Sequence, residues 1–229
     1  MQSELRAMTA QSSISRAFLL VADSPNTDGE RSYWGLQRWA TFEFWQSAIE
    51  GSPLHNIMAR QVASSIGDDK WSYFLSTVES ARKLQAEYRQ AGVSFDLLDV
   101  RPCERQTEGD EESTRPGFLG FDVSTPSLRS VIYEELLSLG PDDATLNDLA
   151  PVFRVASLYF TPRLNQWGLF ASFSDALLFR DMLGVLEAIA PACFVPEWGE
   201  LFIFSLTVLG PIDGPGTAAA CQSVGPQCL

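Results

Sequence analysis

Histidine and cysteine are both scarce in this chain of 229 residues, which contains the single histidine His55. Common zinc and non-haem iron sites use pairs of histidines, so the chain does not predict either kind of site. Its four cysteines, Cys103, Cys193, Cys221 and Cys228, include no C-x-x-C pair. A zinc ribbon and a thioredoxin-like redox motif are therefore excluded, and so few cysteines in so long a chain do not predict a disulfide framework.

Basic residues are also few. Sixteen Lys and Arg stand against 29 Asp and Glu, which gives a net charge of -13 and a pI near 4.4. Because the phosphates would be repelled, direct binding to nucleic acid or to an anionic membrane is not expected. No run of apolar residues is long enough to predict a membrane span. With this cysteine usage and a polar beginning, the sequence predicts a reduced, cytoplasmic protein.

The sequence motifs of several enzyme classes are missing as well. No G-x-S-x-G nucleophile elbow is present, and neither Lys70 nor Lys83 follows a phosphate-binding loop. No G-x-G-x-x-G follows a predicted strand, so a Rossmann site has no fingerprint. No cofactor is expected. His55, beside a predicted helix start, is interpreted as structural or exposed rather than catalytic.

The remaining composition, 45% hydrophobic and 20% charged, is that of a globular protein. We expect one domain over residues 16–210, a disordered segment at 1–15 and a flexible Gly/Pro/Ala tail at 211–229. Apolar runs predict strands at 16–23, 93–100, 117–123, 152–160 and 201–209, the first of them central in the sheet. Helical periodicity predicts helices at 33–49, 54–66, 69–91, 125–139 and 175–189. This order predicts an α+β fold with a mixed or antiparallel sheet of about five strands and helices packed on it.

An acidic stretch at residues 102–116 is predicted to be a solvated loop, because its charges cannot bury one another. Residues 102–229 carry a net charge of -11, against -2 for residues 1–101. Two interpretations stay open: a docking surface for a basic partner, and a loop that only keeps the protein soluble. On the first interpretation the rim contacts are Glu108, Asp110, Glu111, Glu112, Asp142 and Asp143.

An aromatic-rich segment supplies candidate anchors for a partner. Six aromatic residues lie between positions 33 and 45, and Trp34 and Phe44 fall off the main apolar stripe of the predicted helix. Exposed aromatic residues of this kind are typical interface anchors. A helix buried on two sides gives the same pattern, so both interpretations remain open.

Three aspartates offer an enzymatic alternative. Asp23, Asp99 and Asp122 each lie at or near the end of a predicted strand, where converging carboxylates can bind Mg²⁺ or divide acid and base roles. Aspartate is equally common as a turn residue. A nucleophilic Cys103 or Cys193 also stays open, although neither has a recognisable histidine partner; Cys193 is interpreted as a small core residue.

Residues 117–128, GFLGFDVSTPSL, resemble a pattern of bacterial cytoplasmic immunity proteins of polymorphic-toxin systems. In that pattern an apolar strand ending in G-[FY]-D-V leads through a short polar turn into a helix that begins near a Ser-Leu pair. The resemblance implies an acidic protein without catalytic motifs that binds a cognate toxin and blocks its active site or its folding. It transfers no binding residues, because such surfaces differ between cognate pairs.

Together these features predict a non-enzymatic acidic protein that neutralises a basic protein toxin by occlusion. Acidic side chains would meet the basic cleft of the partner, and apolar anchors would supply most of the affinity. Two alternatives remain: a metal-dependent hydrolase that uses the strand-end carboxylates, and a self-assembling structural subunit. A homodimer is compatible with each of these functions.

Overall fold

The computed structural model describes residues 16–22, 53–65, 74–125, 130–132, 150–189 and 200–210. Within these residues four strands form one antiparallel sheet in the order β1-β2-β4-β3. The strands are β1 (Ala17–Ala22), β2 (Phe95–Cys103), β3 (Phe118–Ser124) and β4 (Phe202–Leu209). The helices that pack on the sheet confirm the predicted α+β class.

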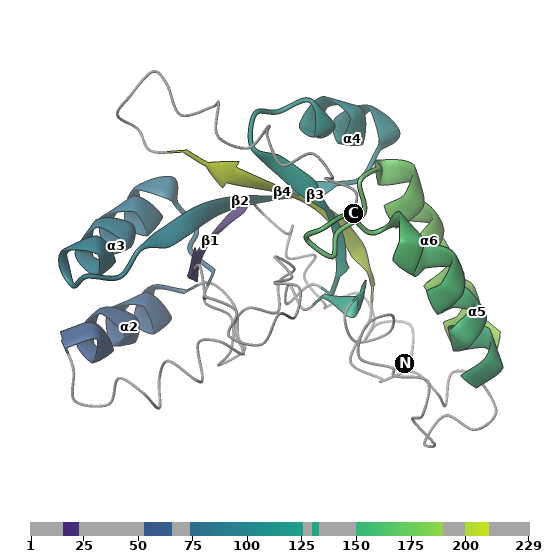
Figure 1. The fold of residues 1–229 in the computed structure, drawn as a ribbon, viewed down its shortest axis with the longest axis horizontal. Helices are drawn as coiled ribbons and strands as arrows, with labels where there is room; N and C mark the ends of the chain where they lie inside the picture. Colours follow the sequence, from purple (N-terminus) through teal and green to yellow (C-terminus); the bar gives the residue numbers. More distant parts are fainter. Residues whose placement is uncertain are drawn as a thin grey trace, which may run out of the picture.

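The helices gather at the two ends of the sheet (Figure 1). The helices α2 (Pro53–Ser64) and α3 (Val78–Gln90) lie beside β1 and β2, whereas α5 (Ala150–Phe160) and α6 (Phe173–Ile189) lie on the β3 side. The short helix α4 (Gln106–Ser113) connects β2 to β3, and one 3₁₀ turn, η4 (Thr161–Arg163), follows α5. No helix in the described ranges has the length and apolarity needed to cross a membrane.

The first strand lies at an edge of the sheet, so its predicted central position is wrong. Its apolar sequence has another cause, because consecutive side chains from Ala17 to Leu20 are all buried although the strand is at the edge. Along the outer edge of β1, Phe18 and Leu75 exchange two backbone hydrogen bonds of 2.8 Å. At the opposite edge, Phe121 of β3 and Phe170 exchange two more, of 2.8 and 2.9 Å. Both edges are thus partly covered, which removes exposed backbone groups that would otherwise pair with other chains.

Two other elements also differ from expectation. The helix predicted from residue 69 begins at Val78, because Leu75, which follows Phe74, forms backbone hydrogen bonds with β1 instead. The N-cap is Thr77, whose hydroxyl accepts from the Ser80 N–H. Residues 152–160 are part of helix α5 rather than a strand. In a short apolar run the two are hard to distinguish by periodicity, and here burial of Ala156 and Phe160, four residues apart, follows the helical repeat.

Buried apolar side chains form two clusters rather than one. The first joins α2 and α3 to β1 and β2, and the second joins α5 and α6 to β3. Representative members are Ile57, Leu84 and Leu97 in the first cluster and Phe121, Phe160 and Phe179 in the second. Polar side chains on one face of the sheet form the candidate site.

Several predictions lie outside the described residues. These are the two terminal segments at 1–15 and 211–229, the helix at 33–49 and most of the helix at 125–139. The same holds for the candidate site residues Asp23, Trp34, Phe44, Asp142 and Asp143, and for Cys193, Cys221 and Cys228.

Candidate functional site

One face of the sheet carries an unusual row of polar residues. Alternate residues of a strand point to the same face, so Asp99, Arg101 and Cys103 of β2 share one face. The register of β4 places Thr207 opposite Asp99 and Ser205 opposite Arg101. Thr207 and Ser205 are both buried. Of this row, Cys103 belongs to the second apolar cluster.

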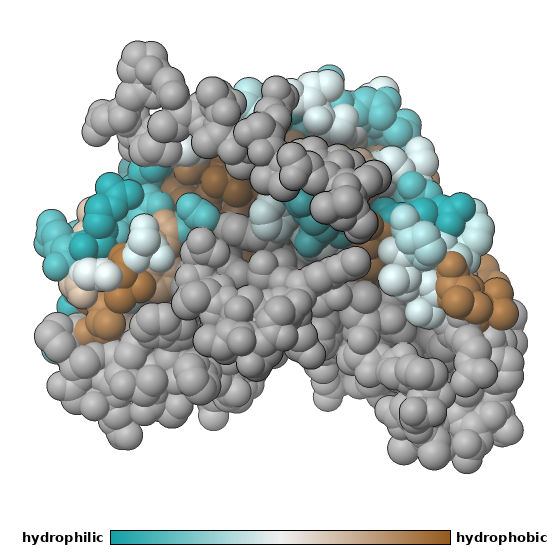
Figure 2. All heavy atoms as spheres, viewed as in Figure 1, coloured by the Kyte–Doolittle hydropathy of each residue, from teal (hydrophilic) through white to brown (hydrophobic). Residues whose placement is uncertain are grey.

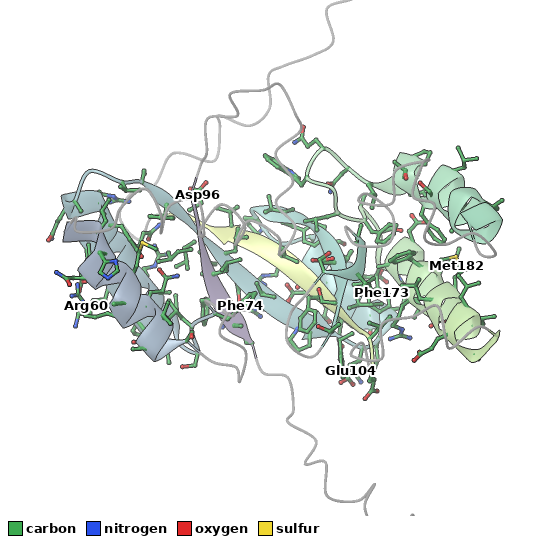
Figure 3. The ribbon with its side chains drawn as sticks, turned by 90° about the horizontal axis from the view of Figure 1, so that it is seen from below. Arg60, Phe74, Asp96, Glu104, Phe173 and Met182 are labelled. Carbon is green, nitrogen blue, oxygen red and sulfur yellow. The ribbon has the colours of Figure 1, made fainter. Side chains whose placement is uncertain are left out.

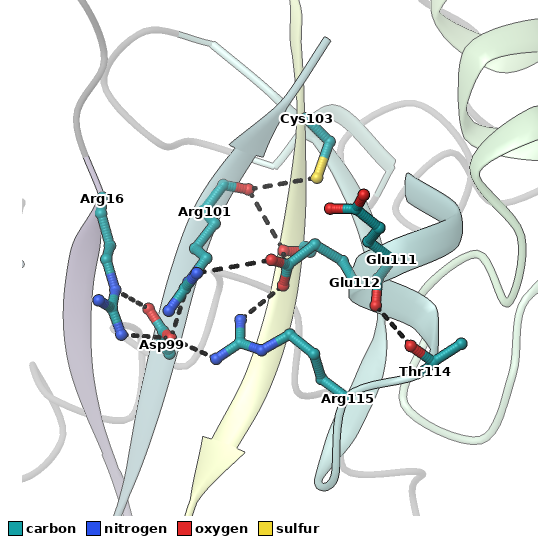
Figure 4. Close-up of polar contacts among 9 residues, drawn as sticks. Arg16, Asp99, Arg101, Cys103, Glu111, Glu112, Thr114 and Arg115 are labelled. Atoms are coloured by element: carbon teal, nitrogen blue, oxygen red, sulfur yellow. Dashed lines mark hydrogen bonds and ion pairs between the residues drawn. The ribbon is translucent and has the colours of Figure 1, made fainter. Parts of the chain in front are cut away.

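Three arginines converge on the buried carboxylate of Asp99 (Figure 4). Arg16 donates through Nε at 2.6 Å and Nη2 at 2.7 Å, while Arg101 Nε and Arg115 Nη2 each donate at 2.9 Å. The Asp99 side chain is 0% exposed, against 45%, 31% and 25% for Arg16, Arg101 and Arg115. We refer to Arg16, Arg101 and Arg115 as the arginine cluster.

These contacts keep Asp99 ionised. Burial acts to raise the pKa of its carboxyl, but hydrogen bonds from Arg16 and Arg115 and the charges of Arg101 and Arg16 outweigh burial, so the pKa lies below its ordinary value. With four N–H groups already bound, the carboxylate has little capacity left to take up a proton from a substrate. Asp99 is therefore suited to holding charges in place rather than to acid–base chemistry.

The same cluster anchors helix α4 to the sheet. Glu112, near the end of α4, accepts from Arg115 Nη1 at 2.5 Å and from the Ser205 hydroxyl at 3.1 Å, and Arg101 Nη1 lies 3.6 Å away. The Glu112 side chain is only 14% exposed. One carboxylate thus connects α4 to β2, to β4 and to the turn before β3.

The start of α4 is held by different contacts. Glu108 accepts the backbone N–H groups of Glu104 at 2.9 Å and of Arg105 at 3.3 Å, together with the Arg105 guanidinium. These bonds, the Glu104 N–H first, lower the pKa of Glu108. Gly109 faces α6, where an added Cβ would lie 2.5 Å from Cβ and Cγ of Phe173. Only glycine lets the two helices approach so closely.

The prediction of a solvated loop at 102–116 is therefore wrong. This segment consists of the end of β2, the helix α4 and a turn, because two of its acidic residues have partners. Glu108 caps the helix, and Glu112 pairs with the arginine cluster. Three carboxylates of this segment, those of Glu104, Asp110 and Glu111, remain exposed. In Figure 3, Glu104 projects outward while Phe173 points toward the sheet between the helices. We call Glu104, which lies two residues before α4, together with Asp110 and Glu111 of the helix the acidic face of α4.

Of the predicted strand-end carboxylates, the two that lie among the described residues, Asp99 and Asp122, do not converge. Asp99 and Asp122 both lie inside their strands, and the register sets Asp99 opposite Thr207 but Asp122 opposite Phe204, so their side chains are on opposite faces of the sheet. Asp122 accepts a 2.7 Å hydrogen bond from the Ser130 hydroxyl. Among the described residues no group of three His, Cys, Asp or Glu could hold a metal ion together.

Cys103 is also unsuited to the nucleophilic role left open by the sequence. Burial raises the pKa of its thiol to about 11; the Ser205 hydrogen bond opposes this shift and the charge of Glu112 adds to it. The thiolate, which is the reactive form, is therefore scarce at neutral pH. His55 is exposed on α2, as its sequence position suggested.

The sequence did not identify the arginine cluster, because its members are far apart in the chain. One signal was available: Asp99 and Arg101 interrupt the apolar pattern of the second strand, and opposite charges two residues apart in a strand share a face. Arg16 and Arg115 gave no comparable signal, since only the strand pairing and the turn after α4 bring them to Asp99.

Comparison of the chain with protein-family models, with curated proteins and with solved structures found no match.

Proposed function

We propose that this chain is a non-enzymatic, cytoplasmic binding protein that occludes a basic protein partner, in the manner of an immunity-type inhibitor. The observation that carries this proposal is the state of helix α4. Glu112 and Gly109 fix the helix to the sheet and to α6, while its acidic face of Glu104, Asp110 and Glu111 stays in solvent.

A fixed acidic face favours association for two reasons. Complementary charge speeds diffusional encounter with a basic partner and selects it over other proteins. A helix that is already held in place also loses little conformational freedom on binding, so less of the interaction energy is spent on ordering it. An acidic segment without partners of its own would give the first effect but not the second.

Exposed apolar residues on α6 provide candidate anchors. The start of helix α6 contacts α4, and the exposed Leu178 and Val185 of α6 are seven residues apart, which places them along one stripe of that helix. Leu178 is 47% exposed and Val185 57%. Figure 2 shows apolar side chains gathered over α5 and α6, in brown at the lower right. An apolar centre beside a charged rim is the usual anatomy of a protein interface.

The finer class of immunity protein rests on the resemblance at residues 117–128. In the fold, residues 118–124 form β3, which supports α6 through the edge-to-face contact of Phe121 with Phe173, 5.7 Å between ring centroids. The segment that carries the resemblance would thus support the binding surface rather than contribute to it.

The decisive experiment compares two triple variants with the same net charge. The first neutralises the acidic face of α4 by Glu104→Gln, Asp110→Asn and Glu111→Gln. A basic protein that co-purifies with the tagged wild type from its native cells is identified by mass spectrometry and purified. Its association rate with the wild type and with each variant is then measured against salt concentration.

The control triple variant neutralises three exposed carboxylates elsewhere, by Glu79→Gln, Glu187→Gln and Glu200→Gln. We expect the α4 variant to associate about tenfold more slowly at low salt, and the control less than about twofold, because steering depends on local charge. Equal rates for the two variants, or a rate independent of salt, would refute α4 as the docking element.

A further inference from the structure

The hydrogen-bonding capacity of the arginine cluster exceeds what its two carboxylates use. A guanidinium has five N–H groups. Arg16 donates to Asp99 from Nε and Nη2. Arg101 donates to Asp99 from Nε, and its Nη1 lies near Glu112. Arg115 donates to Glu112 from Nη1 and to Asp99 from Nη2. Within the described residues, Nη1 of Arg16, Nη2 of Arg101 and Nε of Arg115 donate to no protein acceptor.

The charge of the cluster is also unbalanced. Among the described residues, three guanidinium groups face the two carboxylates of Asp99 and Glu112, so these five side chains carry a net charge of +1 in a protein of net charge -13. The two carboxylates also have little capacity to accept further N–H groups, because both oxygens of Asp99 and Oε2 of Glu112 already accept hydrogen bonds. The remaining attraction for negative charge is directed outward.

We propose that the arginine cluster is a binding site for a phosphate-type oxyanion. Tetrahedral oxyanions suit this site because a guanidinium presents pairs of N–H groups to two oxygens at once, and because the several oxygens of one anion can accept from more than one guanidinium group. The carboxylates hold the guanidinium groups at fixed positions, so binding does not require long side chains to be ordered first. The side chains remain 25–45% exposed, which leaves the anion a route to them from solvent.

This site is distinct from the acidic face of α4, which would repel such a ligand, and its test needs no protein partner. Inorganic phosphate is titrated into the full-length protein in a calorimeter, in parallel with sodium acetate at matched ionic strength. The Nε–H resonances of arginine are followed by NMR in the same titration. We expect saturable one-to-one binding of phosphate, weaker binding of acetate, and shifts confined to the arginine cluster.

Two variants separate a binding site from a purely structural cluster. Arg16→Lys keeps the positive charge beside Asp99 but removes the guanidinium fork, and we expect it to weaken phosphate binding about tenfold, as for the loss of one charge-assisted hydrogen bond. Arg60→Lys is the matched control, because Arg60 is also an exposed arginine bonded to a carboxylate, that of Glu87 at 2.5 Å. It should leave phosphate binding unchanged.

The proposal is overturned if phosphate produces no saturable heat, if acetate binds as tightly as phosphate, or if the NMR shifts fall outside the arginine cluster. It is equally overturned if Arg16→Lys and Arg60→Lys bind phosphate alike. The wild-type NMR titration decides the matter even where a variant is too unstable to study.

Discussion

Replacing Asp99 by asparagine removes the charge around which the arginine cluster is built. The carboxylate is fully buried and accepts four N–H groups. Asparagine replaces one carboxylate oxygen by an NH2 group, which is a donor and would face the N–H groups of the arginines. Removing one partner of a buried ion pair costs about 3–5 kcal/mol. Because the three guanidinium groups are 25–45% exposed and can be rehydrated, we expect a loss of about 2–3 kcal/mol in the free energy of unfolding.

The dependence on pH gives this prediction a second, independent signature. The pKa of Asp99 in the folded protein is below its ordinary value of 3.8, since the arginines outweigh the effect of burial. A group with a lowered folded pKa contributes stability above its unfolded pKa, and the contribution is lost as pH falls through the folded pKa. The difference between wild type and Asp99→Asn should therefore be constant from neutral pH to about pH 5 and shrink below about pH 4.

Urea denaturation followed by circular dichroism over this pH range measures both effects. Asp110→Asn is the matched control, because Asp110 is an exposed aspartate on α4, and its substitution should change stability by less than about 0.5 kcal/mol. The reasoning would be refuted if Asp99→Asn destabilised no more than Asp110→Asn. It would also be refuted if the difference from wild type failed to narrow in acid.

Two further predictions test the packing around the site. Gly109→Ala should destabilise the protein by about 1–3 kcal/mol, because the added Cβ would lie 2.5 Å from Phe173. Gly184→Ala, whose added Cβ would have nothing within 4 Å, should instead stabilise the protein by about 0.5–1 kcal/mol, because alanine favours the helix. Thermal melts measure both changes, and a change of the same sign in the two variants would contradict the close α4–α6 contact. In a variant with Cys103 as its only cysteine, a pKa of about 11 and burial predict that thiol reagents at neutral pH react only as fast as the protein unfolds. Rapid labelling under native conditions would show that the thiol is accessible.

Local pattern was sufficient for much of the fold. The helix at 54–66, the helix at 175–189 and the strand at 201–209 were predicted from periodicity and apolar runs and are confirmed as α2, α6 and β4. Gly92 has a φ of +86° just after the C-cap of α3, a conformation that glycine adopts without strain. These features depend on contacts within a few residues, which a sequence displays directly.

The errors occurred where distant contacts outweigh local pattern. The acidic stretch at 102–116 was predicted to be a solvated loop because its charges cannot bury one another, yet Arg101 and Arg115 neutralise Glu112, and Gly109 allows α4 to pack on α6. Likewise, the apolar first strand was predicted to be central, but it lies at the edge of the sheet. On its outer side it pairs with Leu75, a single bridging residue.

Composition and periodicity are enough to predict the fold class, the strong negative charge and the absence of several enzyme motifs, because these properties do not depend on which residues are neighbours in space. Which carboxylates are buried against arginines, and which stay exposed on α4, depends on how the strands and helices pack. Arg16 and Asp99 are separated by 83 positions, and only the antiparallel pairing of β1 with β2 brings their side chains within hydrogen-bonding distance. Electrostatic energy depends on such distances and on burial, and neither quantity can be read from the sequence alone.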